Sequence, residues 1–176
     1  MISSAMELFA ERGFEQTTAG DIAEHAGVTE RTFFRHFADK REVLFDGSGT
    51  MQQTAYEAIL AAPADLAPLD AALAGMVAGG GLLEQMHDHA VRRFRIISAN
   101  PGLQERELLK LAAMVDTTAE ALRKRGVTEP AASLAAHSAV TVFHVAFTRW
   151  VSTQEAEPPG FATCIAETAA ALRALK

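Results

Sequence analysis

The sequence predicts an all-α fold of about nine helices, arranged as a small N-terminal unit followed by a larger C-terminal one. Val and Ile are scattered along the chain and do not alternate with polar residues, so strand patterns are nearly absent. Ala, Leu, Glu and Arg, which favour helices, dominate the 176 residues. Glycines, prolines and threonines suited to helix ends divide this helical pattern into segments.

The first three helices begin and end at residues suited to those positions. The first starts near residue 2 and ends before Gly13, because glycine accepts the left-handed conformation that often follows a helix. Thr17 or Thr18 caps the second helix, which stops at Gly27. Thr29 then caps the third. Each cap offers a hydroxyl oxygen to the unpaired backbone N–H groups of the first turn.

Proline and glycine delimit the remaining helices. Asp39 caps the fourth, with Glu42 completing a capping box, and Gly47 and Gly49 interrupt or weaken it before it resumes through TMQQTAYEAILAA. The triple glycine at 79–81 is expected to end the fifth helix, and EAEPPG is expected to form a loop before the ninth. The fifth to ninth helices are expected at about residues 69–78, 82–99, 101–125, 130–153 and 161–175.

The overall composition predicts a soluble cytoplasmic protein. The formal charge is −6, which disfavours a purely electrostatic nucleic-acid binder or a basic membrane-surface protein. Cys164 is the single cysteine, so no intrachain disulfide can form and a reducing compartment fits best. The N-terminal MISSAMELF lacks the pattern of a secretory signal, and no stretch approaches the ~20 apolar residues of a membrane helix. No membrane partner is expected.

The second and third helices form a predicted helix-turn-helix. Gly27 permits a positive φ at the turn, so the two helices can cross steeply. The residues expected to face the interior are Ile22, Ala23, Ala26, Val28, Phe33 and Phe37. The residues on the other side of the third helix are Glu30, Arg31, Thr32, Arg35 and His36. These side chains have the length and hydrogen-bonding groups to reach base edges and phosphates, although such a corner also occurs in all-α proteins that bind no DNA.

The amino-acid sequence of this region also resembles that of a known family. TTAGDIAEHAGVTERTFFRHFADKREVLF closely resembles the DNA-binding signature of the tetracycline-repressor-like (TetR/AcrR) family of bacterial transcriptional regulators. AMELFAERGFEQ, which precedes it, resembles the family's first helix, and the match runs over residues 2–45 almost without a gap. The resemblance implies a helix-turn-helix DNA-binding domain at residues 1–46 and a helical effector-binding and dimerisation domain at residues 47–176.

The resemblance also implies DNA contacts. Thr18 would hold a phosphate with its hydroxyl and backbone N–H, and His36 and Lys40 would grip the phosphate backbone. Arg31, Thr32 and Arg35 would face the major groove, where an arginine bonded to guanine contributes about 1–3 kcal/mol of discrimination. The expected DNA-binding residues are Thr18, Thr29, Arg31, Thr32, Phe34, Arg35, His36 and Lys40.

Two features depart from the family pattern. Phe34 stands where the family usually has a tyrosine whose hydroxyl reaches a phosphate, so only packing against the sugar-phosphate backbone remains. Residues 1–46 hold five basic residues against nine acidic ones, a formal charge of −4, and no basic arm precedes the first helix. Either leading residues are absent from the sequence, or DNA affinity depends on a few contacts and on dimerisation.

For the larger domain, the resemblance implies a homodimer formed through the last two helices, a palindromic operator, and a small-molecule effector that changes the separation of the two DNA-binding heads. The effector is expected to be mostly apolar. The expected ligand-binding residues are Met86, Phe94, Met114, Thr141, His144 and Phe147. Met and aromatic residues at helical spacing also fit an ordinary hydrophobic core.

A polar stripe in the eighth helix has three interpretations. It comprises His137, Thr141, His144 and Thr148. It would form hydrogen bonds across a dimer interface, line one wall of a ligand pocket, or hold a metal. The third interpretation is disfavoured, because His137 and His144 lie about 10 Å apart along a helix and cannot share one ion.

The arginines of EQMHDHAVRRFRII also leave alternatives open. Arg92, Arg93 and Arg95 would form a solvated face paired with nearby acids, bind an anionic group of a ligand, or contact the N-terminal unit. The chain has no phosphate-binding glycine loop, HExxH motif or nucleophile elbow, so no catalytic residue, cofactor or metal is expected. A helical adaptor or small-molecule-binding protein that no longer binds DNA is the alternative to a regulator.

Overall fold

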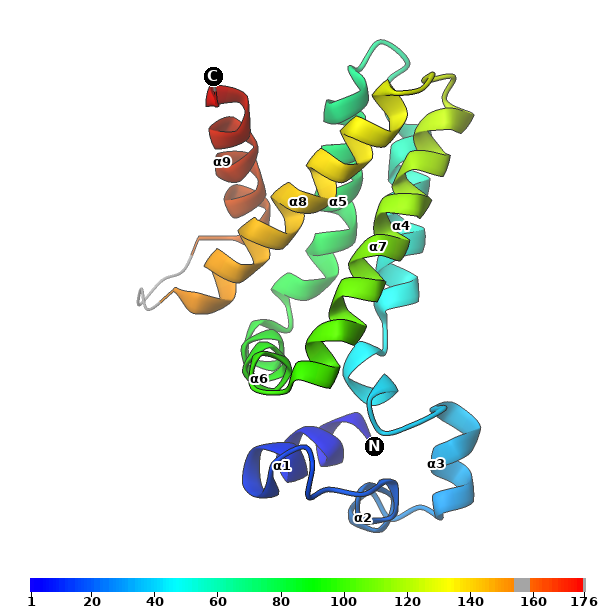
Figure 1. The fold of residues 1–176 in the computed structure, drawn as a ribbon, viewed down its shortest axis with the longest axis vertical. Helices are drawn as coiled ribbons and strands as arrows, with labels where there is room; N and C mark the ends of the chain where they lie inside the picture. The colour runs from blue at the N-terminus through cyan, green and yellow to red at the C-terminus, as the bar shows by residue number, and fades with distance from the viewer. Residues whose placement is uncertain (154–158, 176) are drawn as a thin grey trace. The chain divides into compact units, whose positions relative to one another are not determined.

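The computed structural model describes residues 1–153 and 159–175, which contain nine α-helices, one 3-10 helix and no strand (Figure 1). The predicted all-α class is confirmed. The predicted EAEPPG loop lies largely outside the described residues. The elements are α1 (Ile2–Arg12), α2 (Ala19–His25), α3 (Glu30–His36), η1 (Glu42–Phe45), α4 (Ser48–Ala61), α5 (Pro68–Glu84), α6 (His87–Ser98), α7 (Pro101–Lys124), α8 (Ala131–Ser152) and α9 (Phe161–Ala174).

The chain divides into two compact units, each built from more than one segment. The head unit comprises residues 1–48 and 88–107, and the body unit comprises residues 49–87 and 108–176. In the head unit, Leu8 and Phe33 are almost completely buried and share one hydrophobic core with Ile97 and Leu103 from the second segment. The core of the N-terminal helices is thus completed by residues 88–107, which lie far along the chain from them. The functional division at residue 46 stays a prediction.

The fourth predicted helix is interrupted, as the glycines indicated. It consists of η1 and α4, and Gly47 between them has φ +81°, a conformation that favours glycine. The Asp39 side chain accepts hydrogen bonds from the backbone N–H groups of Arg41 (2.7 Å) and Glu42 (3.3 Å). Asp39 thus accepts two backbone N–H groups ahead of and at the start of η1, but it is not the cap residue that the sequence predicted: Arg41 caps η1 and makes no side-chain capping bond.

The prediction that α5 ends at the triple glycine is wrong. α5 continues to Glu84, and α6 begins at His87 instead of residue 82. Tertiary packing explains the difference, because a Cβ at Gly79 would lie 2.8 Å from the Met51 carbonyl oxygen, and one at Gly80 would lie 2.6 Å from the Phe161 ring. The close approach of α4 and of the start of α9 excludes a side chain there, and this packing overrides the low helix propensity of glycine.

The body core gathers around α8, which packs against both α5 and α9 (Figure 1). Four aromatic side chains of the body core are buried together: Phe143, Phe147, Trp150 and Phe161. The rings of Trp150 and Phe161 lie 5.1 Å apart, and those of Phe143 and Phe161 meet edge to face at 5.3 Å. Aromatic pairs in this arrangement contribute about 0.5–1.5 kcal/mol beyond their burial.

The expectation that no segment resembles a membrane helix needs correction. α8, with 22 residues and a mean hydropathy of 1.3 in its most apolar window, is long and apolar enough to cross a membrane. Half of that window is buried inside the fold. A helix packed between two neighbours is apolar on several sides, so the core position of α8 accounts for its composition.

Candidate nucleic-acid interface

The turn between α2 and α3 is built by local sequence. Gly27 takes φ +68°, and Val28 donates its backbone N–H to the Ala23 carbonyl at 2.9 Å, which closes the end of α2. Thr29 then caps α3, since its hydroxyl accepts the backbone N–H of Thr32 at 3.2 Å. These contacts lie within ten residues of one another, which is why the sequence alone predicted the turn at Gly27 and the cap at Thr29.

α3 has one buried side and one exposed side. Phe33 is 0% exposed and Phe37 is 8% exposed, and both belong to the head core. Phe34, by contrast, is 49% exposed and meets Phe33 edge to face at 5.4 Å. The exposed side carries Arg31, Phe34, Arg35 and His36. The structure therefore brings four of the predicted DNA-binding residues together on one surface.

The two arginines of this surface have no carboxylate partner among the described residues. Among the described residues, neither Arg31 nor Arg35 forms an ion pair. Arg41, in contrast, pairs with Asp39 at 2.6 Å. The hydrogen bond from Arg41 lowers the pKa of the Asp39 carboxyl. An arginine without a carboxylate partner presents its full fork of donors to a phosphate or a guanine, so the exposed side of α3 can act as a local cationic surface on an acidic unit.

Thr18 is engaged in a capping box. Its backbone N–H and its hydroxyl both donate to the Asp21 carboxylate, at 2.7 and 2.6 Å, and Asp21 returns its backbone N–H at 3.0 Å. These hydrogen bonds from Thr18 lower the pKa of Asp21. The groups expected to hold a phosphate are thus occupied by a carboxylate from the same helix. Phosphate binding by Thr18 stays a prediction, and it requires sharing these donors.

The two threonines of α3 are also joined. The hydroxyls of Thr29 and Thr32 lie 3.0 Å apart, and Thr32 is half-buried. A hydroxyl has one donor and two acceptor lone pairs, so this bond leaves each oxygen with capacity for another partner. Their predicted contacts with DNA therefore remain compatible with the cap, and remain predictions.

Lys40 points into the head unit. Its ammonium donates to the carbonyls of Phe14 (2.7 Å), Thr17 (3.0 Å) and Glu15 (3.4 Å), and lies 4.3 Å from the centre of the Phe14 ring. Lysine has three N–H donors, and all three are used here. Lys40 also precedes η1 and lies outside any helix, whereas a fourth helix capped by Asp39 would have begun with it. Its grip on a phosphate stays a prediction that requires these bonds to be exchanged.

The predicted ligand-binding residues are not gathered into one buried site. In the body unit, Met114 and Phe147 are buried, whereas Met86 is 50% exposed. Thr141 and His144 lie on the exposed side of α8. Phe94 belongs to the head unit and is half-buried. A pocket that uses all six residues stays a prediction.

The sequence left the roles of the three α6 arginines open, and the structure shows what Arg93 contacts. Arg93 donates from Nε to the Leu44 carbonyl at 2.6 Å and forms a bidentate pair with Glu107. Its contact with the N-terminal segment was among the expected alternatives. The carbonyl partner itself carries no sequence signal, because any residue at position 44 offers the same oxygen.

Comparison with known proteins agrees with this geometry. The family model described as bacterial regulatory proteins, tetR family, matches residues 1–46. The HTH-type transcriptional regulator TcmR from Streptomyces glaucescens is 36% identical over 109 residues, which cover 58% of this chain and 48% of TcmR. The chain therefore spans about half the length of this curated relative.

Two solved structures share the fold. One is FadR from Thermus thermophilus, in complex with lauroyl-CoA, with a TM-score of 0.57 and 23% identity over 98% of this chain and 91% of that chain. The other is PfmR from the same species, with a TM-score of 0.53 and 21% identity over 99% of this chain and 98% of that chain. At this level of identity the likeness concerns the fold.

Proposed function

Because the chain belongs to the tetR family of bacterial regulatory proteins, which regulate transcription and are not enzymes, we propose that it is a DNA-binding regulator that acts in the cytoplasm as a homodimeric repressor. It binds a palindromic operator and leaves it when a small, mostly apolar effector binds. The exposed side of α3 carries the proposal, since Arg31, Arg35 and His36 present donors outward while Phe33 is fully buried.

The proposed dimer forms through α8 and α9. The exposed side of α8 mixes apolar and hydrogen-bonding groups: Leu134 is 64% exposed and Val145 is 43% exposed, with His137, Thr141 and His144 beside them along the helix. This composition supports the dimer-interface interpretation of the polar stripe over the pocket-wall interpretation. A two-fold dimer would place two copies of α3 about one helical turn of DNA apart, or a multiple of it.

The proposed effector has a substantial apolar portion. FadR, a protein of this fold, is in complex with lauroyl-CoA, so the fold accommodates a long apolar ligand. The buried apolar side chains of the body unit, Met114 and Phe147 among them, supply suitable walls. An effector that prefers the conformation with a changed head separation would shift the population away from the DNA-bound one.

Binding to DNA from upstream of the protein's own gene tests the proposal. Fluorescence anisotropy at a series of salt concentrations should give an affinity that falls steeply with salt, because neutralised phosphates release counterions. Arg35→Gln should weaken binding about 5- to 150-fold, the equivalent of a lost bidentate base contact of ~1–3 kcal/mol. Arg123→Gln is the control, since Arg123 is an exposed body-unit arginine paired with Glu129 at 3.0 Å.

The alternative is a helical adaptor or small-molecule-binding protein that has lost DNA binding. It is favoured by the exposed apolar Phe34 and by the formal charge of −4 over residues 1–46. The same titration separates the two functions. Absence of binding at every salt concentration, by a folded wild-type protein, supports the adaptor and refutes the repressor.

A further inference from the structure

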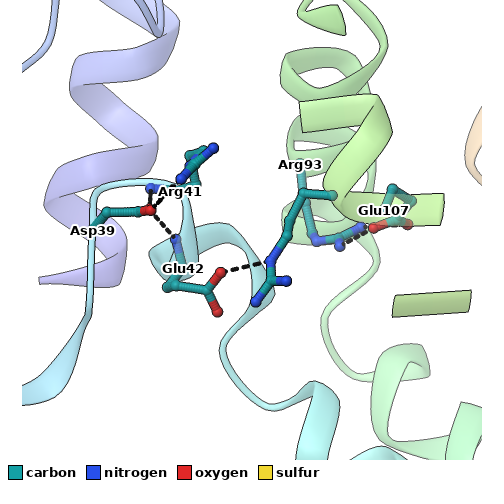
Figure 2. Close-up of polar contacts among 6 residues, drawn as sticks. Asp39, Arg41, Glu42, Arg93 and Glu107 are labelled. Carbon is teal, nitrogen blue, oxygen red and sulfur yellow. Dashed lines mark hydrogen bonds and ion pairs between the residues drawn. The ribbon is translucent and has the colours of Figure 1, made fainter. Parts of the chain in front are cut away.

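The segment that follows α3 is held by residues distant in the sequence. η1 begins six residues after α3 ends, and its Val43, Leu44 and Phe45 are buried in the head core. The direction of the chain leaving α3 is therefore set by where η1 is anchored. α6 and the start of α7 provide that anchor through Arg93 and Arg106, which contact Leu44 and Glu42. Figure 2 shows the Arg93–Glu107 pair together with the Asp39, Arg41 and Glu42 side chains.

Arg93 makes three kinds of contact at this anchor. Its Nε donates to the Leu44 carbonyl at 2.6 Å, and its terminal nitrogens donate to both Glu107 oxygens, at 3.2 and 2.7 Å. The guanidinium also lies 5.0 Å from the centre of the Phe45 ring. The Arg93 and Glu107 side chains are only 18% and 23% exposed. A planar fork bound on both edges fixes orientation in a way that an ammonium or an apolar side chain cannot.

A second pair holds the other end of η1. Arg106 donates from Nε to Glu42 at 2.7 Å, and the two side chains are 34% and 24% exposed. The backbone N–H of Glu42 donates to the Asp39 carboxylate. Two arginines from residues 88–107 thus contact η1, one near its start and one near its end. A partly buried ion pair contributes little net stability after desolvation, so fixed geometry is the better explanation of this arrangement.

We propose that Arg93, assisted by the Arg106–Glu42 pair, is a positioning residue for DNA recognition that holds α3 at the angle needed to enter the major groove. This inference rests on the proposed DNA-binding function. We expect no direct contact of Arg93 with DNA, because three of its five N–H donors are bound by Leu44 and Glu107 and its side chain is only 18% exposed. Its loss should therefore misorient the phosphate-binding and base-reading side chains without removing any of them.

The test compares full-length variants for binding to the same upstream DNA. Arg93→Lys keeps the charge and loses the fork, and it should weaken binding about tenfold while the slope of log affinity against log salt stays as in the wild type, because no phosphate contact is lost. Arg95→Met is the matched control, since Arg95 is exposed on the same helix, and it should bind as the wild type does. Circular dichroism establishes that each variant is folded at the assay temperature.

Charge exchange gives a second measurement. Glu42→Gln should weaken binding, and the double variant Glu42→Arg with Arg106→Glu should recover most of the affinity lost by Glu42→Arg alone. If Arg93→Lys does not fold, this series carries the test. Wild-type affinity in folded Arg93→Lys or Glu42→Gln overturns the inference, and so does a salt slope reduced by about 0.9 in Arg93→Lys, which indicates a direct phosphate contact. If the wild type binds no DNA, the proposed function fails first.

Discussion

Replacement of Gly75 by alanine should destabilise the body unit, although alanine is the better helix former. In an exposed helix, this change stabilises by about 1 kcal/mol. At Gly75 the added Cβ would lie 2.5 Å from Ile59 Cγ1 and 2.8 Å from the Ala55 carbonyl oxygen. A backbone oxygen cannot rotate away, so α4 and α5 must separate, and such overpacking costs about 3 kcal/mol. The expected net loss is about 2 kcal/mol.

Gly81→Ala is the matched control in the same helix. A Cβ at Gly81 would meet no heavy atom within 4 Å, so only the propensity gain of about 1 kcal/mol remains. The two variants have the same composition and differ by about 3 kcal/mol in expected stability. With a urea m-value of roughly 2 kcal/mol per molar, their midpoints should differ by about 1.5 M.

Trp150 provides the assay. It is the single tryptophan of the chain, it belongs to the body unit, and it is 3% exposed. Its emission during urea unfolding therefore reports the unit in which the substitutions are made, even if the two units unfold in separate steps. A Gly75→Ala midpoint equal to or above that of Gly81→Ala would refute the reasoning that close packing, and not helix propensity, selects glycine at position 75.

Two further predictions concern the head unit. Lys40→Met should lower the free energy of unfolding of the head unit by about 2 kcal/mol, because three carbonyls lose a charged donor. Arg41→Met should cost little, and thermal unfolding followed by circular dichroism compares the two variants. A stable Lys40→Met variant whose DNA affinity depends less steeply on salt would instead identify Lys40 as a phosphate ligand. Burial, assisted by Arg93 and Arg92, lowers the pKa of His89, whose Nε2 is buried without a hydrogen-bond partner among the described residues. The unfolded chain then binds a proton at higher pH than the folded chain, so stability should fall as the pH drops below about 6.5. The stability advantage of His89→Leu over the wild type should grow as the pH is lowered from 7.5 to 5.5. A difference in urea midpoint that does not change with pH would contradict this.

Local sequence was sufficient for the helix-turn-helix and insufficient for its supports. The caps at Thr18 and Thr29 and the turn at Gly27 depend on neighbours within a few residues, so the residue types alone indicated them. The bonds of Lys40 join it to carbonyls 23 to 26 residues away, and Arg93 reaches one 49 residues away. Backbone carbonyls occur at every position, so no sequence pattern identifies which one a distant cation will meet.

The extent of α5 shows a second limit. A run of three glycines is normally a reliable end of a helix. This rule failed because a side chain at Gly79 or Gly80 would clash with Met51 or Phe161. The sequence contains the same glycines whether they break a helix or permit close contact. The choice depends on segments that fold against them, and these lie at residues distant in the chain.

The discontinuity of the head unit bears on how the protein can be dissected and recombined. A fragment ending at residue 48 would leave the core surface around Leu8 and Phe33 without Ile97 and Leu103, and would expose apolar area to water. Chimeric regulators, in which one protein's DNA specificity is grafted onto another's sensor, should therefore transfer residues 88–107 together with residues 1–48. A graft made at the end of η1 alone would join a foreign α3 and η1 to the Arg93 and Arg106 of this chain, which contact the native η1.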